Sequence, residues 1–404
     1  GAFFQRADGK WMGRVELAPV AGKRRYKWVS SVDRNTCIAK LKKLRADVDA
    51  GRIATTSNTT VEKWMARWID EIHSQKEKPI RPTTIGDYRS VIANHIVPTI
   101  GTKRLDKLTP QHVRDMHRDI GPSRTAVVAH VVLQKALKDA MREGLITRNV
   151  AEAVDKPIYK RTKRKGLSAP IAKHVIRTAI ASRDESEATR VAAAFLTGAR
   201  RGELLGLEWS RVDLDNGSID LSWQLQQLTQ SHGCGTPVDK VWPCGRKLGA
   251  YCPQKRWDFR PDFEYRDCYK SLLWTKPKSQ AGERDVPLIP PLLVALKAMH
   301  ANQGINPHGL VWHQPDGRPI DPRADYDMWK AVFTAAGLIE GDETLAPHTA
   351  RHTTATLLRA AGVDEATRME LIGHSSVDAQ RIYAHADRAR HLEAMSNLAE
   401  LLQT

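Results

Sequence analysis

The sequence His348-Thr349-Ala350-Arg351-His352 is followed by Leu371-Ile372-Gly373-His374 and, nine residues after His374, by Tyr383. The first segment places two imidazoles and one guanidinium within five residues, at the start of a predicted helix. Such a cluster arises by chance or binds a metal, and features elsewhere in the sequence are needed to distinguish these explanations. A zinc site formed by His348, His352 and His374 is unfavourable, because it lacks a His-Glu-x-x-His arrangement and would place the cation beside Arg351.

Length, charge and cysteine content limit the class of protein. The chain has 404 residues, enough for about two or three domains. The net charge of +17 favours a polyanionic partner such as nucleic acid, although a generally basic soluble protein would have the same composition. With five cysteines, no membrane-spanning run and no signal pattern at the N-terminus, we expect a protein of a reducing cytoplasm that makes no membrane contact.

Residues 1–52 are predicted to form a small module of three strands and one helix. The Asp8-Gly9 pair suits a hairpin turn between two apolar strands, and Asp33 can cap a helix after a third strand at 28–32. Several basic side chains of this module could reach phosphates or base edges: Arg6, Lys10, Arg14, Lys23, Arg24 and Arg25. A solvated basic face explains them equally well.

Residues 58–155 are predicted to form an all-helical domain. Thr59-x-x-Glu62 has the pattern of a capping box, and a helix over 84–97 is expected to end at Pro98. The domain contains no chemical motif. A basic linker follows, which could lie along a phosphate backbone or simply be solvated; its cations include Lys160, Arg161, Lys163, Arg164 and Lys165.

Residues 166–404 are predicted to form a third domain of mixed helices and strands. An insertion near 224–272 holds four of the five cysteines, at Cys234, Cys244, Cys252 and Cys268. Their clustering indicates a structural zinc site. No Cys-x-x-Cys pair occurs, however, so a loop with reduced thiols is the alternative.

Four motifs occur in order in this third domain. They are Thr-Gly-x-Arg-x-x-Glu-Leu at 197–204, His-x-x-Arg-His at 348–352, Leu-Ile-Gly-His at 371–374, and Tyr383. Their order and separations resemble those of tyrosine recombinases, with the bacteriophage integrases as the most similar branch. One such motif is weak evidence, whereas four in order are specific.

The resemblance covers nearly the whole chain except the insertion, and it implies a multidomain fold. The N-terminal α+β module would bind arm-type DNA sites. The all-α region would be a core-binding domain, and the mainly helical α+β region would be catalytic.

The chemistry of DNA strand cleavage explains why these residue types are needed. A tyrosine oxygen can hold a phosphate covalently and later release it, and guanidinium groups can stabilise the charge of the phosphorane. The resemblance therefore implies Tyr383 as nucleophile, with Arg200 and Arg351 as phosphate ligands. By the same resemblance His348 would assist proton transfer or hydrogen bonding and His374 would complete the phosphate clamp, while Glu203 and His352 would orient these groups.

The leaving hydroxyl also needs an acid, which in this family is a lysine on a hairpin. Lys278, within Pro-Lys-Ser ahead of Val286-Pro287-Leu288, fits the family pattern best. Lys276 is the second candidate, because the length of this loop varies. This chemistry requires no metal ion or other cofactor.

The resemblance implies a phage-type integrase that recombines phage and bacterial attachment sites through a covalent phosphotyrosyl intermediate. We expect a homotetramer on double-stranded DNA in the cytoplasm of a bacterial host, with an accessory DNA-bending protein and an excisionase as partners. The segment 388–402 would pack in cis or on a neighbouring protomer.

Two other classes of protein share parts of this pattern. A type IB topoisomerase uses the same nucleophile chemistry, and a non-catalytic DNA-binding relative would keep the fold. The arm-like module and the complete set of site residues favour the recombinase. Singly, each side chain could also have only a packing role.

Overall fold

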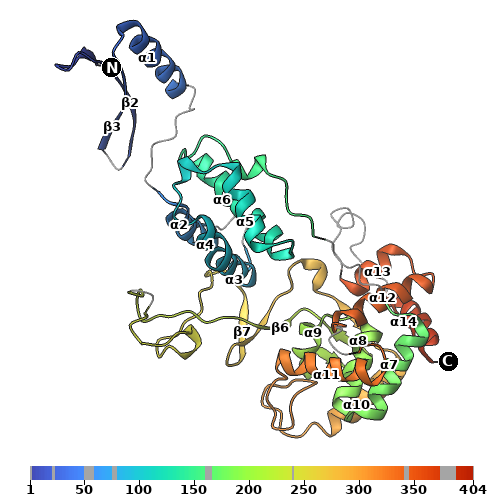
Figure 1. Ribbon diagram of the computed structural model, residues 1–404. Coiled ribbons are helices and arrows are strands. Elements are labelled where there is room, and N and C mark those ends of the chain that lie inside the picture. The colour runs from blue at the N-terminus through green and yellow to red at the C-terminus, as the bar shows by residue number, and fades with distance from the viewer. Residues whose placement is uncertain are drawn as a thin grey trace. The chain divides into compact units, whose positions relative to one another are not determined.

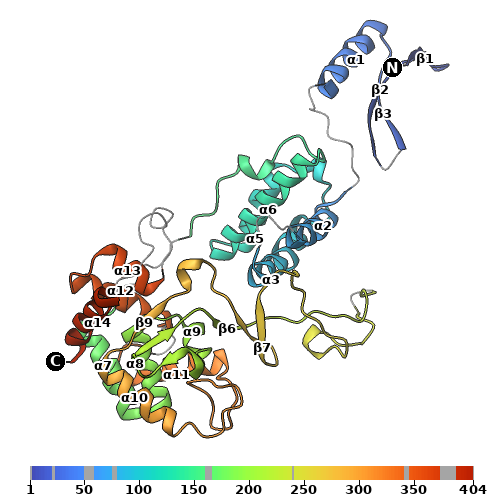
Figure 2. The ribbon, with the colours of Figure 1, turned by 180° about the vertical axis from the view of Figure 1, so that it is seen from behind.

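The computed structural model describes residues 2–20, 23–49, 59–74, 80–159, 166–238, 241–340, 345–373 and 388–403. The chain divides into two compact units, Gly1–Arg161 and Thr162–Thr404 (Figure 1, and from behind in Figure 2). Each unit is described by itself.

The first unit begins with an antiparallel sheet in the order β1-β2-β3, formed by Phe3–Gln5, Trp11–Val20 and Lys23–Ser31. The predicted hairpin turn is present, with Gly9 at a φ of +82°. Asp33 caps α1 (Arg34–Asp49) by accepting the Thr36 backbone N–H at 2.6 Å. Helix α1 packs on the sheet where Gly13 leaves room for Leu41, because an added Cβ at Gly13 would lie 3.0 Å from the Leu41 side chain.

The rest of this unit is helical, as predicted. Its elements are α2 (Val61–Ser74), α3 (Pro82–Val91), the π-helical turn η1 (Ile92–Ile96), α4 (Val97–Ile100), η2 (Leu105–Lys107), α5 (Pro110–Ile120), α6 (Arg124–Arg142) and η3 (Val150–Ala153). Two buried tryptophans of α2 join it to α6: Trp64 Nε1 donates to the Ala136 carbonyl at 2.9 Å, and Trp68 Nε1 donates to Asp139 Oδ2 at 2.8 Å.

Two local predictions in this domain are wrong. The N-cap of α2 is Thr60 rather than Thr59, since Thr60 Oγ1 accepts the Lys63 backbone N–H at 3.3 Å. The helix expected to end at Pro98 continues to Ile100. A proline inside a helix removes one N–H and clashes with the carbonyl four residues before it, and the wider π-helical turn η1 just before Pro98 accommodates both effects.

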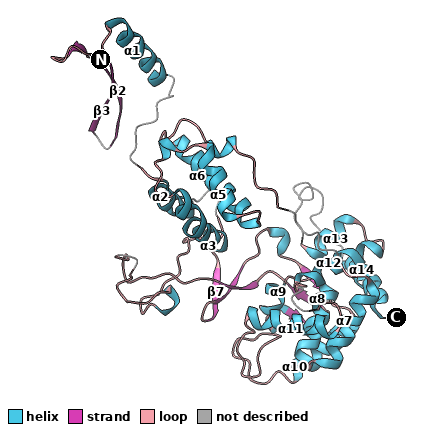
Figure 3. Cartoon of the chain, in the orientation of Figure 1, coloured by secondary structure: helices cyan, strands magenta, loops and turns pink. Residues whose placement is uncertain are grey.

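The second unit is mainly helical (Figure 3). Its helices are α7 (Ala169–Ser182), α8 (Glu185–Thr197), α9 (Arg201–Leu205), α10 (Pro290–Ala301), α11 (Pro322–Ala335), α12 (His348–Ala360), α13 (Glu365–Ile372) and α14 (Arg388–Gln403). A single apolar core joins them, and it includes Phe195 of α8, Phe333 of α11, Leu358 of α12 and Leu398 of α14. No helix in the described part of the chain is both long and apolar enough to cross a membrane.

Two small antiparallel sheets complete this unit. One has the order β4-β5-β9, with strands Val212–Asp213, Ser218–Asp220 and Asp285–Pro287. The Asn216-Gly217 pair, a sequence typical of a tight hairpin turn, joins β4 to β5, and Gly217 has a φ of +65°. The other sheet has the order β6-β8-β7, with strands Gln224–Gln227, Leu272–Thr275 and Tyr265–Tyr269. The short helical turn η4 (Trp209–Arg211) directly precedes β4, and the turns η5 (Gly249–Tyr251) and η6 (Gln280–Gly282) lie between later strands.

The β6-β8-β7 sheet forms the base of the predicted insertion. It packs on α9 through a separate apolar cluster that includes Leu205, Leu225 and Trp274. The contact is close, because an added Cβ at Gly206 would lie 2.6 Å from the Leu225 nitrogen. Together the two units confirm the predicted multidomain fold, with a small α+β module, an all-helical domain and a mainly helical α+β domain.

Candidate active site

Arg200 lies at the N-terminus of α9, just after the glycine turn that ends α8. Gly198 ends α8 in the left-handed conformation, with a φ of +62°. Glu203 accepts the Arg200 backbone N–H at 2.7 Å and the Arg200 Nη1 donor at 2.5 Å. Arg200 Nη2 donates to the Gly373 carbonyl at 2.7 Å. The spacing of the first motif thus lets one carboxylate position both the backbone and the side chain of this arginine.

Glu203 connects Arg200 to another arginine, Arg284, which directly precedes β9. Arg284 Nη1 and Nη2 donate to the two Glu203 oxygens at 3.2 and 2.9 Å, and Arg284 Nε donates to the Leu371 carbonyl at 2.8 Å. Burial raises the pKa of Glu203, but the charges of Arg284 and Arg200 outweigh burial and lower that pKa below its usual range. Glu203 is therefore a carboxylate at neutral pH.

Arg351 projects from α12 and is almost fully buried, with 2% of its surface exposed. Its Nη1 donates to the Gly198 carbonyl at 2.8 Å, while its Nη2 has no hydrogen-bond partner among the described residues. Burial, followed by the like charges of Arg200 and Arg284, lowers the pKa of Arg351 to about 9. The guanidinium still carries its charge at neutral pH, with hydrogen-bonding capacity unused.

Gly373 holds two parts of this site close together. Its φ is +69°, and an added Cβ would lie 2.8 Å from the Ala281 carbonyl oxygen and 2.9 Å from Arg284 Nη1. Only glycine fits this backbone conformation without strain. We call Arg200, Glu203, Arg284 and Arg351 the arginine site.

His348 and His352 form a pair of their own on α12. Their rings are perpendicular, with centroids 4.8 Å apart. His348, the first residue of α12, is exposed, and His352 is half-buried. The structure therefore places both histidines one helical turn apart, His352 directly after Arg351.

The two candidate lysines lie on the loop between β8 and η6. Lys278 is exposed, whereas Lys276 Nζ lies 3.5 Å from a Glu283 oxygen and 4.8 Å from the centre of the Trp223 ring. Gly282 packs this loop near Arg200, because an added Cβ at Gly282 would lie 2.5 Å from Pro277 Cβ and 3.7 Å from Arg200 Nη1. The geometry leaves Lys278 available and engages Lys276.

Several predicted site residues fall outside the described part of the chain. His374 and Tyr383 are among them, and so is the predicted basic linker, Lys160, Arg161, Lys163, Arg164 and Lys165. In the N-terminal module the side-chain positions of Lys23 and Arg25 also lie outside it.

The remaining basic residues of the N-terminal module lie on or beside its sheet. The Arg14 guanidinium lies 4.3 Å from the centre of the Tyr26 ring and 5.4 Å from that of Trp28. Arg6 and Lys10 are exposed near the hairpin turn, and the exposed Arg24 lies 3.9 Å from a Glu16 oxygen.

Arg284 is the member of the arginine site that the sequence prediction missed. The sequence contained a clue, because Arg284 lies just before Val286-Pro287-Leu288, the strand pattern that identified Lys278. The sequence gives no sign that this side chain turns back to Glu203, which lies 81 residues earlier.

The insertion brings together a second cluster of reactive side chains, His232, Cys234, Cys244 and Cys252, whose donor atoms all lie within 4.8 Å of one another. We call it the Cys/His group. The predicted fourth cysteine, Cys268, is not a member of it, because it lies on β7 and packs against the apolar cluster at the base of the insertion. Burial, followed by the charge of Glu208, raises the pKa of Cys268 to about 12.

The arginine site is suited to binding a tetrahedral oxyanion. Three guanidinium groups surround one carboxylate, so the site has a net positive charge. Arg351 Nη2 is a buried donor without a partner among the described residues, and a phosphate oxygen that reached it would accept a charge-assisted hydrogen bond.

Comparison with known proteins identifies the family. The model of the phage integrase family matches residues 267–390, and that of the phage integrase N-terminal SAM-like domain matches residues 60–120. The first match contains Lys278, His348, Arg351, His374 and Tyr383. The second falls within the helical domain of the first unit.

Similar proteins span nearly the whole chain. An integrase of Saccharopolyspora erythraea is 29% identical over 408 residues, which cover 94% of this chain and 91% of that protein. An integrase of Streptomyces ambofaciens is 24% identical, covering 93% of this chain and 89% of that protein.

Solved structures of integrases share the fold. The Tn1549 transposon integrase in complex with transposon right end DNA covers 84% of this chain and 99% of its own, with a TM-score of 0.60 at 18% identity. A lambda integrase dimer bound to a COC' core site covers 96% and 97%, with a TM-score of 0.53 at 17% identity.

The order of the motifs, the arginine site and the family matches agree with one another. The chain belongs to the phage integrase family of tyrosine recombinases and is a site-specific DNA recombinase.

Proposed function

We propose that this recombinase cuts and rejoins double-stranded DNA at phage and bacterial attachment sites through a covalent bond between Tyr383 and a DNA phosphate. The observation that supports this most strongly is the state of Arg351. Its guanidinium is buried and charged, and its Nη2 has no partner among the described residues. Burying such a group without an acceptor is unfavourable, and a bound phosphate would supply the acceptor.

In the proposed step the Tyr383 oxygen attacks the phosphorus atom of the scissile phosphate. A phosphorus–oxygen bond to the tyrosine forms, the bond to the leaving DNA strand breaks, and that strand ends in a free hydroxyl. Arg200 and Arg351 would stabilise the charge on the non-bridging oxygens. His348 and His374 would hydrogen-bond the phosphate or move the tyrosine proton, with His352 orienting this group.

A lysine would donate the proton that the leaving oxygen needs. We assign this role to Lys278, because Lys276 is already engaged with Glu283 and Trp223. Glu203 would keep Arg200 in place and Arg284 would keep Glu203 in place. No divalent metal ion is needed for this step.

The N-terminal module would bind a separate, arm-type DNA site. Its sheet presents Arg14 between the rings of Tyr26 and Trp28, and a β-sheet can enter the major groove, where arginine reads guanine. The neighbouring cations Arg6, Lys10, Lys23, Arg24 and Arg25, with the linker cations at 160–165, would contact phosphates.

The solved relatives include a lambda integrase tetramer bound to a Holliday junction. By analogy we propose that this chain acts as a homotetramer on DNA in the bacterial cytoplasm, with a DNA-bending protein and an excisionase as accessory partners. Helix α14 packs in cis on α12 and α7 within the second unit.

A nicked suicide substrate that carries the attachment site tests the proposal. Cleavage of this DNA releases a short fragment, which prevents religation and traps the protein–DNA adduct for a denaturing gel. We expect the wild-type chain to form the adduct and Tyr383→Phe to reduce it by roughly 10³-fold or more, because the variant lacks the nucleophile.

Tyr326→Phe is the matched control, since Tyr326 lies on α11 outside the proposed site. It should form the adduct at the wild-type rate. An adduct that persists in Tyr383→Phe would show that another residue is the nucleophile. Relaxation of supercoiled plasmid without an attachment site would instead favour a topoisomerase.

A further inference from the structure

The loop between β6 and β7 has no apolar core of its own among its described residues. Among its described residues between 229 and 264, only His232 and Cys252 are buried. Several of its large apolar side chains are exposed, among them Val238, Val241, Leu248 and Tyr251, and the rings of Trp257, Phe259 and Phe263 are only half-buried. A segment of this length cannot hold one conformation by hydrophobic burial alone and usually needs a disulfide or a metal.

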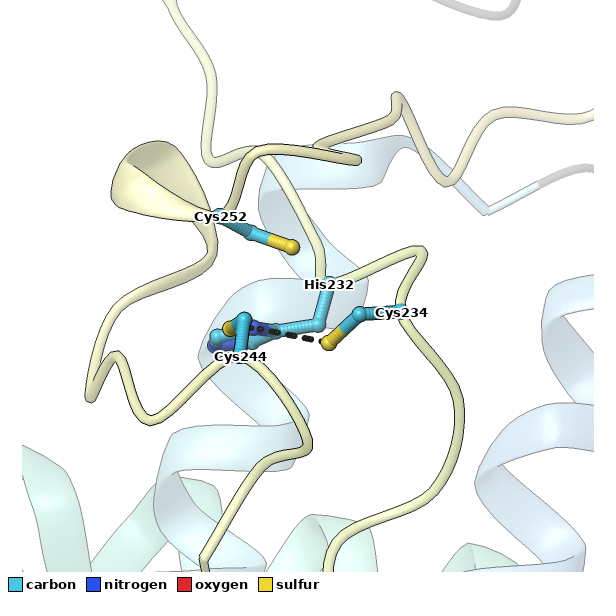
Figure 4. Close-up of side chains that lie close together, drawn as sticks. All are labelled: His232, Cys234, Cys244 and Cys252. Carbon is cyan, nitrogen blue, oxygen red and sulfur yellow. Dashed lines mark hydrogen bonds between the residues drawn. The ribbon is translucent and has the colours of Figure 1, made fainter.

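The two buried side chains of this loop belong to the Cys/His group (Figure 4). We propose that His232, Cys234, Cys244 and Cys252 bind one structural zinc ion, which fixes the insertion of the catalytic domain. The proposal does not depend on the chemistry proposed for Tyr383.

The separations between donor atoms fit a tetrahedral zinc site. Bond lengths of about 2.3 Å to sulfur and 2.1 Å to nitrogen place a sulfur and a nitrogen about 3.6 Å apart in a tetrahedron. Here His232 Nδ1 lies 3.4 Å from Cys244 Sγ and 3.9 Å from Cys234 Sγ. All four donor atoms lie within 4.8 Å of one another, so small shifts would complete the coordination.

Two backbone contacts bring together the chain segments that carry the donors. Gly233 allows its segment to approach Gln254 closely, because an added Cβ would lie 2.1 Å from the Gln254 carbonyl oxygen. Ser231 and Arg256 exchange backbone hydrogen bonds at 2.9 and 3.0 Å next to this contact.

The imidazole has its orientation fixed as well. The His232 ring stacks on Trp242, with centroids 4.1 Å apart and planes 8° from parallel. This contact points Nδ1 at the sulfurs of Cys234 and Cys244. A histidine that merely filled space would not need to be directed at two thiols.

The donor types select zinc over other common ions. Three thiolates and one imidazole in a closed tetrahedral arrangement form a typical structural zinc site, whereas calcium and magnesium prefer oxygen donors. All four cysteines of the insertion are free thiols, so no disulfide competes for the sulfurs. With a neutral histidine the zinc complex would have a net charge of −1, which the nearby Lys255 and Arg256 can balance.

Zinc content measured by mass spectrometry tests the proposal directly. We expect the purified full-length chain to hold about one zinc ion, and the double variant Cys244→Ser/Cys252→Ser to lose about nine-tenths of it. Cys268→Ser is the matched control, because Cys268 lies in the same insertion but outside the group. It should keep the full zinc content. A wild-type chain without zinc after reconstitution, or equal loss in Cys268→Ser, would overturn the proposal.

Two measurements on the wild-type chain avoid the risk that a variant misfolds. Replacement of zinc by Co²⁺ should produce the absorption of a tetrahedral thiolate complex, and an octahedral spectrum would contradict the assignment. Removal of the metal by a chelator should increase tryptic cleavage after Arg246 and Lys255 by about tenfold or more. Unchanged cleavage of metal-free protein would show that the loop does not need the ion, and would overturn the structural role.

Discussion

The arginine site and the Cys/His group occupy the same domain, but different forces hold them in place. The arginine site joins α9, β9, α12 and α13, which share one large apolar core. Its charged groups are paired by hydrogen bonds across that core. The Cys/His group lies in a loop whose other described residues are exposed or half-buried.

The arginine site is therefore formed before its ligand binds, whereas the Cys/His group would be formed by its ligand. Glu203 and the carbonyls of Gly198, Leu371 and Gly373 already position the guanidinium groups without DNA. Such preorganisation is what stabilisation of a transition state requires. The thiols have no comparable scaffold, so the energy of metal binding would also be the folding energy of the loop.

Among variants of the arginine site, replacement of Arg351 by alanine should have the largest effect, because the anion-binding donor is lost. We expect the single-turnover rate of adduct formation on the suicide substrate to fall about 10³-fold. Arg359→Ala, on the exposed side of the same helix, is the control and should change the rate less than about twofold. A rate near wild type in Arg351→Ala would show that the unpaired donor does not serve catalysis.

Glu203→Gln should affect both stability and cleavage, since it leaves two arginines around a neutral amide. Loss of one partner of a buried ion pair costs about 3 kcal/mol, so we expect a comparable fall in the free energy of unfolding and roughly 10²-fold slower cleavage. Denaturant titration and the adduct assay measure the two effects. Glu400→Gln, exposed on α14, should change neither.

The pH dependence of stability provides a sharper test of the same residue. The pKa of Glu203 is lower in the folded chain than in the unfolded chain. The stabilisation of the fold by the ionised Glu203 is therefore fully present above the unfolded pKa of about 4.3. It is lost as the pH falls through the lower folded pKa. Glu203→Gln should therefore lose stability less steeply than wild type below about pH 4.3. Equal slopes would indicate that another carboxylate dominates acid unfolding.

The two sites also differ in how far the sequence predicted them. Arg200 and Glu203 are three residues apart in one motif. Because both lie at the start of α9, this spacing brings their side chains into hydrogen-bonding distance. Cys268 was predicted as a zinc ligand because it is near the other cysteines in sequence, but it belongs to β7 and packs on the base of the insertion. His232 takes its place, since a loop without regular periodicity gives no sequence signal for which residues meet.

Arg284 shows the same limit within the arginine site. The helix that begins with the His348 motif was predicted, and the structure contains it as α12. Which way the Arg284 side chain points depends on the packing of β9 beside α13, where the Leu371 carbonyl accepts its Nε donor. Long-range pairing of this kind is set by tertiary structure, which local spacing does not encode.

Arg284→Lys should have a smaller effect than the two preceding variants. A lysine keeps the positive charge near Glu203 but cannot make the paired contact to both carboxylate oxygens and the contact to Leu371. We expect about tenfold slower adduct formation with little change in DNA affinity, measured by gel shift. Arg284→Gln should be slower still, and equal rates for the two variants would mean that the charge of Arg284 has no role.

Removal of the metal should have the smallest effect on cleavage, although it opens the insertion. The base of the insertion is held on α9 by Leu205, Leu225 and Trp274, which do not depend on the Cys/His group. Because the proposed chemistry uses no metal ion, a chelator does not interfere with it directly. We expect the adduct rate on a short core-site duplex to change less than about twofold, under conditions where tryptic cleavage of the loop rises about tenfold. A parallel loss of DNA cleavage would mean that the loop also positions the arginine site or the DNA. The two regions would then not be independent of each other.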